Sequence, residues 1–285
     1  MIALHRTRAF LRSYAFLPHR LLNRGVSRLT AATRPGWAVH RAIRHWVRRD
    51  GIDLGDFEAR RYESVDDFFL RRLRPGARPL GPGFVAPADG NLVSLGSLEP
   101  SQPLRVKGQE LSPSRVVNGK LHQLSLDRYA GGAHAVIFLT PRGYHHVHAP
   151  MDAELIDVRW IPGRYFPQNA DALRHIPRVY ERNERATLRF RDGRGHEFLL
   201  VMVGASLIGG IHLDGLEGSQ WMRREPFRVG RKFARGERIG HFAFGSTVVV
   251  LLPPELRPRG GERPEVRMGE TLFELEASVE ATVSR

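Results

Sequence analysis

The chain has 285 residues, 41% hydrophobic and 26% charged, so it can bury a full core and lacks the composition of a disordered protein. It has no cysteine, which excludes disulfides, thiolate metal ligands and cysteine nucleophiles. The formal net charge is +14, and residues 1–50 carry most of it, with eleven arginines and one acid, Asp50. The basic character therefore belongs to one segment, which argues against a nucleic-acid-binding fold.

The basic segment predicts amphipathic helices. Within residues 35–49 apolar side chains recur at helical spacing among arginines: Val39, Ile43, Trp46 and Val47. A second helical pattern covers residues 8–22 and is broken at Pro18. A helix of about 15 residues is about 22 Å long, too short for about 30 Å of hydrocarbon, so we expect residues 1–50 to lie on an anionic membrane surface. Two alternatives are a basic helix packed on its own domain and a cleaved targeting peptide.

The rest of the chain predicts one short helix followed by a β-rich core. Ser64, with Asp67 three residues later, is typical of a helix N-cap, and we expect this helix to continue to Leu73. Short apolar or β-branched runs then alternate with glycine and proline turns, at 91–98, 135–140, 153–160, 186–190, 198–203 and 247–252. Residues 164–185 favour an irregular loop or short helices. We expect an α+β fold, with N-terminal amphipathic helices in residues 1–50 and a β-rich catalytic domain of short, mostly antiparallel strands in residues 51–285.

Three short motifs carry side chains suited to catalysis. Pro-Ala-Asp-Gly at 87–90 places Asp89 in a tight turn, Tyr144–Pro150 contains three imidazoles, and Phe-Gly-Ser-Thr at 244–247 places Ser246 directly before a strand. Taken singly, the aspartate is typical of a plain turn and Gly-Ser-Thr occurs by chance, whereas the histidines suit an acid, a base or a ligand. A metal site is disfavoured, because carboxylates near the histidines are few.

The three motifs together also fit a nucleophilic relay. An aspartate, a histidine and a serine can act as orienting group, base and nucleophile. The order Asp89, His148, Ser246 occurs in one protease arrangement, so a serine hydrolase is the alternative function. Ser246 lacks the Gly-x-Ser-x-Gly elbow, which ranks this alternative second. A hydrolase would keep one intact polypeptide and a free Ser246.

These motifs resemble bacterial phosphatidylserine decarboxylase, a self-cleaving, pyruvoyl-dependent family with a Leu-Gly-Ser-Thr cleavage site, a Pro-Ala-Asp-Gly turn and a Tyr-His-x-Val-His motif. The resemblance covers nearly the whole chain, including 17–18, 34–37, 68–79, 106–108, 182–185 and 203–205. The chain departs from the family pattern at Phe244, where leucine is usual, and at His146, where arginine is common. Because the likeness starts at Leu17, inside the basic segment, a retained membrane-surface segment is favoured over a cleaved targeting peptide.

The resemblance implies a self-processing reaction. Asp89 would orient His148, and His148 would take the proton of Ser246, whose hydroxyl would attack the carbonyl of Gly245. The resulting ester would eliminate to dehydroalanine and then hydrolyse to a covalent pyruvoyl group with loss of ammonia. Cleavage between Gly245 and Ser246 gives a long chain, 1–245, and a short pyruvoyl chain, 246–285, which would stay associated.

The resemblance also implies decarboxylation of phosphatidylserine to phosphatidylethanolamine and CO2. The pyruvoyl group derived from Ser246 would form a Schiff base with the substrate amine and act as an electron sink, and His145 is the candidate that returns a proton. The implied partners are a membrane phospholipid and an anionic membrane surface, with the protein peripheral on the cytoplasmic side of the cell membrane. No nucleic-acid partner is expected, and a homodimer is an open option.

One stereochemical condition applies to the histidine motif. On a regular strand residues 146 and 148 share a face and residue 145 points away. His145 and His148 would therefore serve one site only if the segment bends, for which Pro141, Gly143 and Pro150 are suitable residues.

Overall fold

The computed structural model describes residues 19–119, 123–205, 210–216, 226–243, 246–256 and 264–274, with side chains from residue 25 onward. The helices are α2 (His19–Thr30), α3 (Gly36–Asp50), α4 (Val65–Phe69), α5 (Pro113–Val117), α6 (Ala170–His175), α7 (Val179–Arg182) and the 3-10 helix η2 (Asp127–Tyr129). No helix in this part of the chain is long and apolar enough to cross a membrane.

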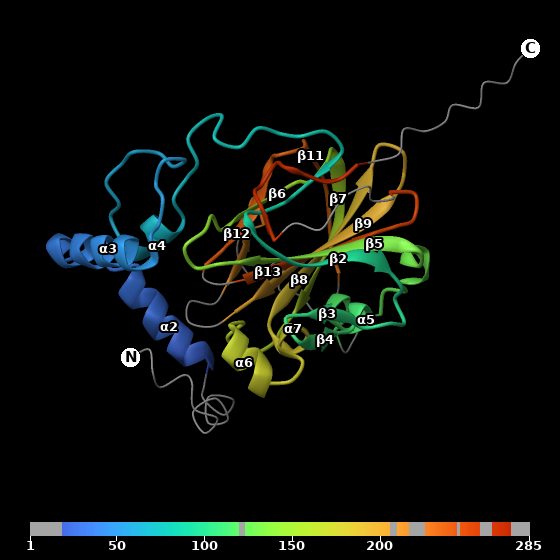
Figure 1. Ribbon diagram of the computed structural model, residues 1–285, viewed down its shortest axis with the longest axis horizontal. Helices are drawn as coiled ribbons and strands as arrows, with labels where there is room; N and C mark the ends of the chain where they lie inside the picture. The colour runs from blue at the N-terminus through green and yellow to red at the C-terminus, as the bar shows by residue number, and fades with distance from the viewer. Residues whose placement is uncertain are drawn as a thin grey trace, which may run out of the picture.

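The N-terminal helices lie beside the β-rich core (Figure 1). Helix α3 confirms the prediction for residues 35–49 and ends where Gly51 takes up a left-handed conformation, with φ 60°. The pattern predicted at 8–22 lies mostly outside the described residues, and α2 continues past its expected end to Thr30.

Helix α4 begins as the sequence predicts and ends earlier. The Ser64 hydroxyl accepts a hydrogen bond from the Asp67 amide at 3.0 Å, which is the expected N-cap. The expected end at Leu73 is wrong, because the helix ends at Phe69 and Leu73 forms a β-bridge with Phe57. The segment after α4 is thereby paired with the segment before it.

The apolar face of α3 packs inside the molecule. Val39 and Ile43 are buried in a cluster with Phe68, and the Trp46 ring stacks on Phe69 with 6.2 Å between ring centroids. The apolar spacing of residues 35–49 is therefore used mainly for packing on α4. Trp37, which is 72% exposed, lies outside this cluster.

The strands are β1 (Phe84–Val85), β2 (Gly90–Leu98), β3 (Leu104–Val106), β4 (Gln109–Leu111), β5 (Gly132–Leu139), β6 (His146–His148), β7 (Ala153–Ile161), β8 (Arg185–Asp192), β9 (Glu197–Gly204), β10 (Ile211–Leu213), β11 (Phe227–Phe233), β12 (Arg238–Phe242), β13 (Ser246–Leu252), β14 (Glu265–Val266) and β15 (Thr271–Phe273). Within the described ranges they form an eight-stranded sheet in the order β11-β7-β8-β9-β13-β5-β2-β14, a three-stranded sheet β10-β12-β6, and the pairs β1-β15 and β3-β4. All these strand pairs are antiparallel, and α6 and α7 occupy the predicted loop at 164–185. The expected α+β fold is confirmed.

Strand β13 lies in the middle of the large sheet and is buried on both faces. Val248 and Val250 belong to a core cluster shared with the three-stranded sheet, whereas Val249 and Leu251 pack in a second cluster with α5, α6 and α7. Figure 1 shows β6 and β12 on one side of this sheet and α5, α6 and α7 on the other. Because side chains alternate along a strand, Ser246 shares the face of Val248 and points toward the three-stranded sheet.

Candidate active site

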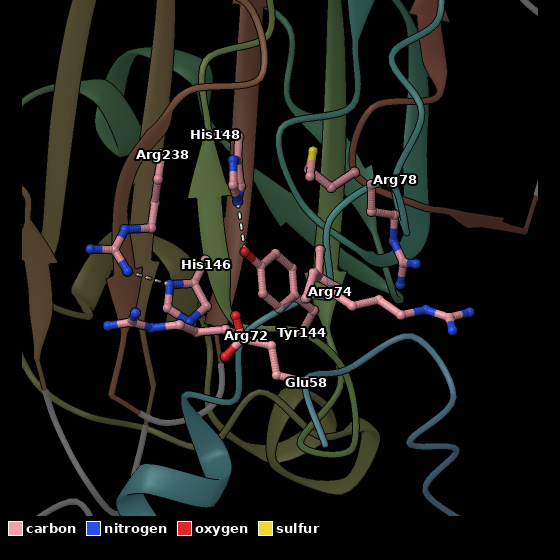
Figure 2. Close-up of a pocket in the computed structure, with 11 residues that line it drawn as sticks. Glu58, Arg72, Arg74, Arg78, Tyr144, His146, His148 and Arg238 are labelled. Carbon is pink, nitrogen blue, oxygen red and sulfur yellow. Dashed lines mark hydrogen bonds between the residues drawn. The ribbon is translucent and has the colours of Figure 1, made fainter. Parts of the chain in front are cut away.

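Strand β6 carries the histidine motif, and its alternation divides the motif between two sides. Val147 packs in the core cluster between the two sheets, so that side of β6 faces the large sheet. His146 and His148 lie on the other side and, together with Tyr144, line a cavity of about 410 Å³ (Figure 2). His145 does not line this cavity. The bend that would bring His145 and His148 to one side is thus not seen.

His148 is a buried, neutral imidazole with both ring nitrogens bonded. Nδ1 lies 2.8 Å from the carbonyl oxygen of Gly236, which only accepts hydrogen bonds, so Nδ1 is the donor. Nε2 therefore accepts from the Tyr144 hydroxyl at 2.9 Å. Burial lowers the pKa of His148, and the bond to Gly236 opposes this in part. Nε2 is therefore the ring nitrogen with a lone pair, and the Tyr144 hydroxyl occupies it.

His146 has a clear structural role at the same cavity. Its Nε2 donates to the carbonyl oxygen of Leu70 at 3.2 Å, and its Nδ1 accepts from Arg238 at 3.4 Å. Its ring stacks on Tyr144 with 4.8 Å between centroids. Burial lowers the pKa of His146 to about 3, so this histidine is a neutral bridge between elements.

His145 is fully buried on the side of β6 that faces the large sheet. Its Nε2 donates to the carbonyl oxygen of Thr140 at 2.9 Å, and its ring lies 4.0 Å from the Phe69 ring. Its Nδ1 has no hydrogen-bond partner among the described residues. Burial, followed by the positive charge of Arg71, lowers the pKa of His145 to about 3. His145 therefore presents one unprotonated, unpaired nitrogen.

Ser246 lies at the start of β13, paired with Leu139 of β5 and Gly204 of β9. It is 0% exposed, and its Oγ has no hydrogen-bond partner in the described part of the chain. A buried hydroxyl without a partner is costly in a native protein and is commonly kept for chemistry. The residue thus fits the serine that a self-processing reaction would convert into a pyruvoyl group.

His145 approaches Ser246 through two neighbouring segments. Its ring bonds Thr140, the residue after the strand partner of Ser246, and its carbonyl oxygen accepts from the Phe242 amide at 3.0 Å, at the end of the strand that leads to Ser246. Two buried polar atoms without a hydrogen-bond partner among the described residues, His145 Nδ1 and Ser246 Oγ, therefore lie on segments that are joined by these contacts.

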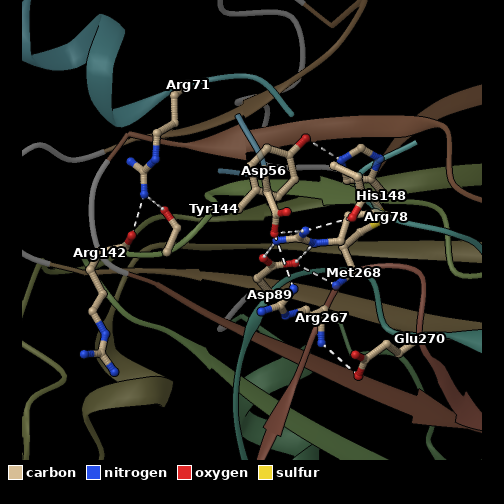
Figure 3. A network of polar contacts seen from close by, with 12 residues as sticks. Asp56, Arg71, Arg78, Asp89, Arg142, Tyr144, His148, Arg267, Met268 and Glu270 are labelled. Carbon is tan, nitrogen blue, oxygen red and sulfur yellow. Dashed lines mark hydrogen bonds and ion pairs between the residues drawn. The ribbon is translucent and has the colours of Figure 1, made fainter. Parts of the chain in front are cut away.

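Asp89 is fixed by a network that sequence reasoning missed (Figure 3). Arg78 donates to both carboxylate oxygens, at 3.2 and 2.6 Å, and the Met268 amide donates to Oδ1 at 2.7 Å. The carboxylate lies close to His148, whose amide donates to the carbonyl oxygen of Pro87 at 2.8 Å. No hydrogen bond joins Asp89 to His148 among the described residues; the carboxylate raises the pKa of His148 only through its charge.

The sequence-predicted residues therefore form two groups. Asp89 and His148 lie together on the cavity side of β6, and His145 and Ser246 lie on the side of the large sheet. Tyr144 and Arg78 are additional polar residues of the first group, and both stand inside sequence motifs that carried the resemblance. No group of histidines and acids that could hold a metal ion occurs in the described ranges.

Comparison with known proteins identifies the family of this chain. A family model for phosphatidylserine decarboxylase matches residues 65–274. A phosphatidylserine decarboxylase proenzyme of Chromobacterium violaceum is 32% identical over 282 residues, which cover 93% of this chain and 98% of that protein. Proteins of the same name from Pseudomonas aeruginosa and Brevibacillus brevis are 33% and 31% identical, covering 93% and 83% of this chain and 96% and 86% of their own. The chain belongs to the phosphatidylserine decarboxylase family.

Proposed function

We propose that this protein is made as a proenzyme that cleaves itself between Gly245 and Ser246 and then decarboxylates phosphatidylserine to phosphatidylethanolamine. The observation that carries the proposal is the buried, unpaired hydroxyl of Ser246 at the start of a central strand, in a chain of this family. The comparisons give no support to the serine-hydrolase alternative.

The decisive test is a pair of measurements on the purified protein. Vesicles that contain phosphatidylserine labelled at the carboxylate should release labelled CO2, and a carbonyl reagent should label only the 246–285 piece. Release of fatty acid or headgroup without CO2 would favour a hydrolase and overturn the proposal.

The cleavage step requires a base for the Ser246 hydroxyl and an acid for the departing amide nitrogen. We propose the relay of Asp89, His148 and Ser246 for this step, with the proton passing to His148 Nε2. In the described structure that nitrogen is bonded to Tyr144, and His148 lies on the opposite side of β6 from Ser246, so the relay requires Tyr144 to release the imidazole and the β6 segment to turn it toward β13. Asp89, held by Arg78 and Met268, would stabilise the imidazolium through its charge.

Decarboxylation requires a group that accepts electrons and a residue that returns a proton. The pyruvoyl group derived from Ser246 supplies the electron sink when present. His145 is the proposed proton donor, because it lies on the face of β6 turned toward β13; its Nδ1, unpaired among the described residues, would first take up a proton from solvent and then pass it to the substrate carbon. The surrounding apolar side chains, including Phe69 and Val147, exclude water from this side.

The two pieces are expected to stay together after cleavage. The short chain would contribute β13, hydrogen-bonded to β5 and β9, as well as β14 and β15, which pair with β2 and β1. Size-exclusion chromatography should therefore show both pieces in one peak, and 246–285 should separate only in denaturant. Elution of the short chain by itself under native conditions would contradict this arrangement.

We also propose that the N-terminal helices hold the protein on the cytoplasmic, anionic face of the membrane. Arg41, Arg44 and Arg48 are exposed on α3, and Trp37 and Leu29 are 72% and 75% exposed. Since Val39 and Ile43 pack internally, the membrane contact would consist of these arginines with Trp37 and Leu29, and not of the buried apolar face. Each arginine near an anionic surface contributes on the order of 1 kcal/mol.

Replacing Arg41, Arg44 and Arg48 by glutamine should weaken binding to anionic vesicles by about 10- to 100-fold at low salt. Co-sedimentation across a salt series measures this, and the parent should bind less as salt rises. The matched control is a triple glutamine variant at Arg105, Arg174 and Arg228, which are exposed and lie outside α2 and α3. Equal loss in both triple variants would show that only net charge matters and would contradict a dedicated surface.

A further inference from the structure

Arg71 is a fully buried cation without an acidic partner. Its side chain is 0% exposed, and it forms no ion pair with a described residue. Its guanidinium donates to the carbonyl oxygens of Arg142 and of Gly143, the latter at 2.6 Å, and to that of Phe68 at 3.3 Å (Figure 3). It also lies over the Phe57 ring, 4.5 Å from the centroid. These carbonyl groups and ring faces stabilise the charge in place of a carboxylate.

The buried charge persists at neutral pH. Burial lowers the pKa of Arg71 to about 10, which leaves the guanidinium protonated under physiological conditions. Burying a cation carries a desolvation cost that an apolar side chain of similar size does not have, so packing alone does not explain an arginine here. The position of the group therefore calls for a function.

The segment that carries Arg71 contacts the histidine motif at each of three consecutive residues. The Phe69 ring lies 4.0 Å from the His145 ring, and the carbonyl oxygen of Leu70 accepts from His146 Nε2. Arg71 itself binds the carbonyl groups of residues 142 and 143, directly before Tyr144. Residues 69–71, here called the clamp, thus fix the motif on both sides of His145.

The clamp also contributes to the electrostatic surroundings of His145, where burial has the largest effect on the pKa and Arg71 the second largest. Among the described residues the charged or titratable groups that act on His145 are Arg71 and His146, and both disfavour its protonated form. The carbonyl oxygen of Thr140 holds the proton on Nε2. The unprotonated nitrogen is therefore Nδ1, which is unpaired in the described part of the chain.

We propose that Arg71 is a positioning residue for His145: its buried guanidinium fixes the loop that presents the imidazole, so that Nε2 stays bonded to Thr140 and Nδ1 stays open to accept a proton. The consequence for catalysis rests on the role proposed above for His145. The positioning of the His145 ring by Arg71 does not rest on that role, because it is a property of the folded, uncleaved chain.

The test uses the full chain with Ser246→Ala, so that no step depends on cleavage. Nitrogen-15 NMR of labelled histidines reads the tautomer, the titration midpoint and the solvent exchange of the His145 ring proton. In the parent, Nε2 should carry the proton and stay neutral down to about pH 3. Arg71→Met should raise the midpoint by about 1 pH unit, a tenfold change in proton affinity, and speed ring-proton exchange by about tenfold.

The matched control is Arg72→Met, the next residue, whose side chain is exposed and outside the clamp contacts. It should leave the midpoint and the exchange rate at the parent values. A folded Arg71→Met protein with the parent midpoint and the parent exchange rate would overturn the proposal.

Arg71→Lys separates the effect of the charge from the effect of the hydrogen-bond geometry. It tests the positioning role if circular dichroism shows that Arg71→Met does not fold. The ammonium keeps the charge but lacks the planar fork whose Nη1 binds the Phe68 carbonyl group while Nη2 binds those of Arg142 and Gly143. The titration midpoint should stay near the parent value, while ring-proton exchange should rise by about tenfold. Parent exchange in a folded Arg71→Lys protein would overturn the positioning role. Failure of the unmodified precursor to cleave would instead count against the proposed function and leave these NMR outcomes intact.

Discussion

Ser246→Ala is expected to leave the protein as one uncut chain without decarboxylase activity, whereas the unmodified protein runs as two pieces, 1–245 and 246–285. In the proposed reaction this hydroxyl attacks the Gly245 carbonyl, so its removal should abolish cleavage and with it the pyruvoyl group. The neighbouring hydroxyl of Thr247 cannot replace it, because it lies on the opposite face of β13 and donates to Gln168 at 2.6 Å. Intact-mass spectrometry of freshly purified protein measures the outcome directly.

The same chemical change at a neutral position provides the control. Ser97→Ala removes a hydroxyl from an exposed position of β2 and should leave cleavage complete. Two pieces from Ser246→Ala would rule out Ser246 as the nucleophile. A single uncut chain in the unmodified protein, with an intact fold, would argue against self-cleavage altogether.

The sequence predicted the secondary structure well where local signals are strong. The cap at Ser64, the helix over residues 35–49 and the central strand near 247–252 follow from local side-chain chemistry and periodicity. The end of α4 could not be predicted, because it depends on the distant pairing of Leu73 with Phe57. The apolar spacing of α3 likewise predicts an apolar face but not what covers it. Whether that face lies on a membrane or in the internal cluster around Phe68 depends on tertiary contacts.

The site was predictable in composition and only partly in geometry. The alternation rule correctly placed His146 and His148 on one face and His145 on the other, since it needs only local backbone geometry. The partners of Asp89 depend on tertiary contacts, because Arg78 lies 11 residues before it outside any shared element and the Met268 amide lies 179 residues after it. Alternation places Tyr144 and His148 on one face but does not predict their hydrogen bond, because residues four apart on a regular strand are separated by about 13 Å.

The two histidines are expected to respond differently to substitution. If the relay is assigned as proposed, His148→Ala and Asp89→Asn stay uncut, whereas His145→Ala cleaves and then fails to decarboxylate. A lost general base or acid lowers a rate by about 10²- to 10⁴-fold, so the effects will be plain in a time course of cleavage and of CO2 release. His45→Ala, an exposed histidine on α3, serves as the control and should keep both activities.

The structure also offers an explanation for the opposite result, in which His145→Ala and not His148→Ala blocks cleavage. His145 Nδ1 and Ser246 Oγ are both buried and unpaired within the described ranges, while both nitrogens of His148 are bonded. If His145→Ala stays uncut and His148→Ala cleaves, the two roles are exchanged, and His145 is the base for Ser246. His145→Gln guards against a packing artefact, since its amide can still donate to the Thr140 carbonyl oxygen but cannot take a proton. Cleavage of the His145→Gln protein would show that self-processing needs the side chain at 145 only to hold the segment in place. Loss of CO2 release in that same cleaved protein would show that the proton transfer by His145 belongs to decarboxylation.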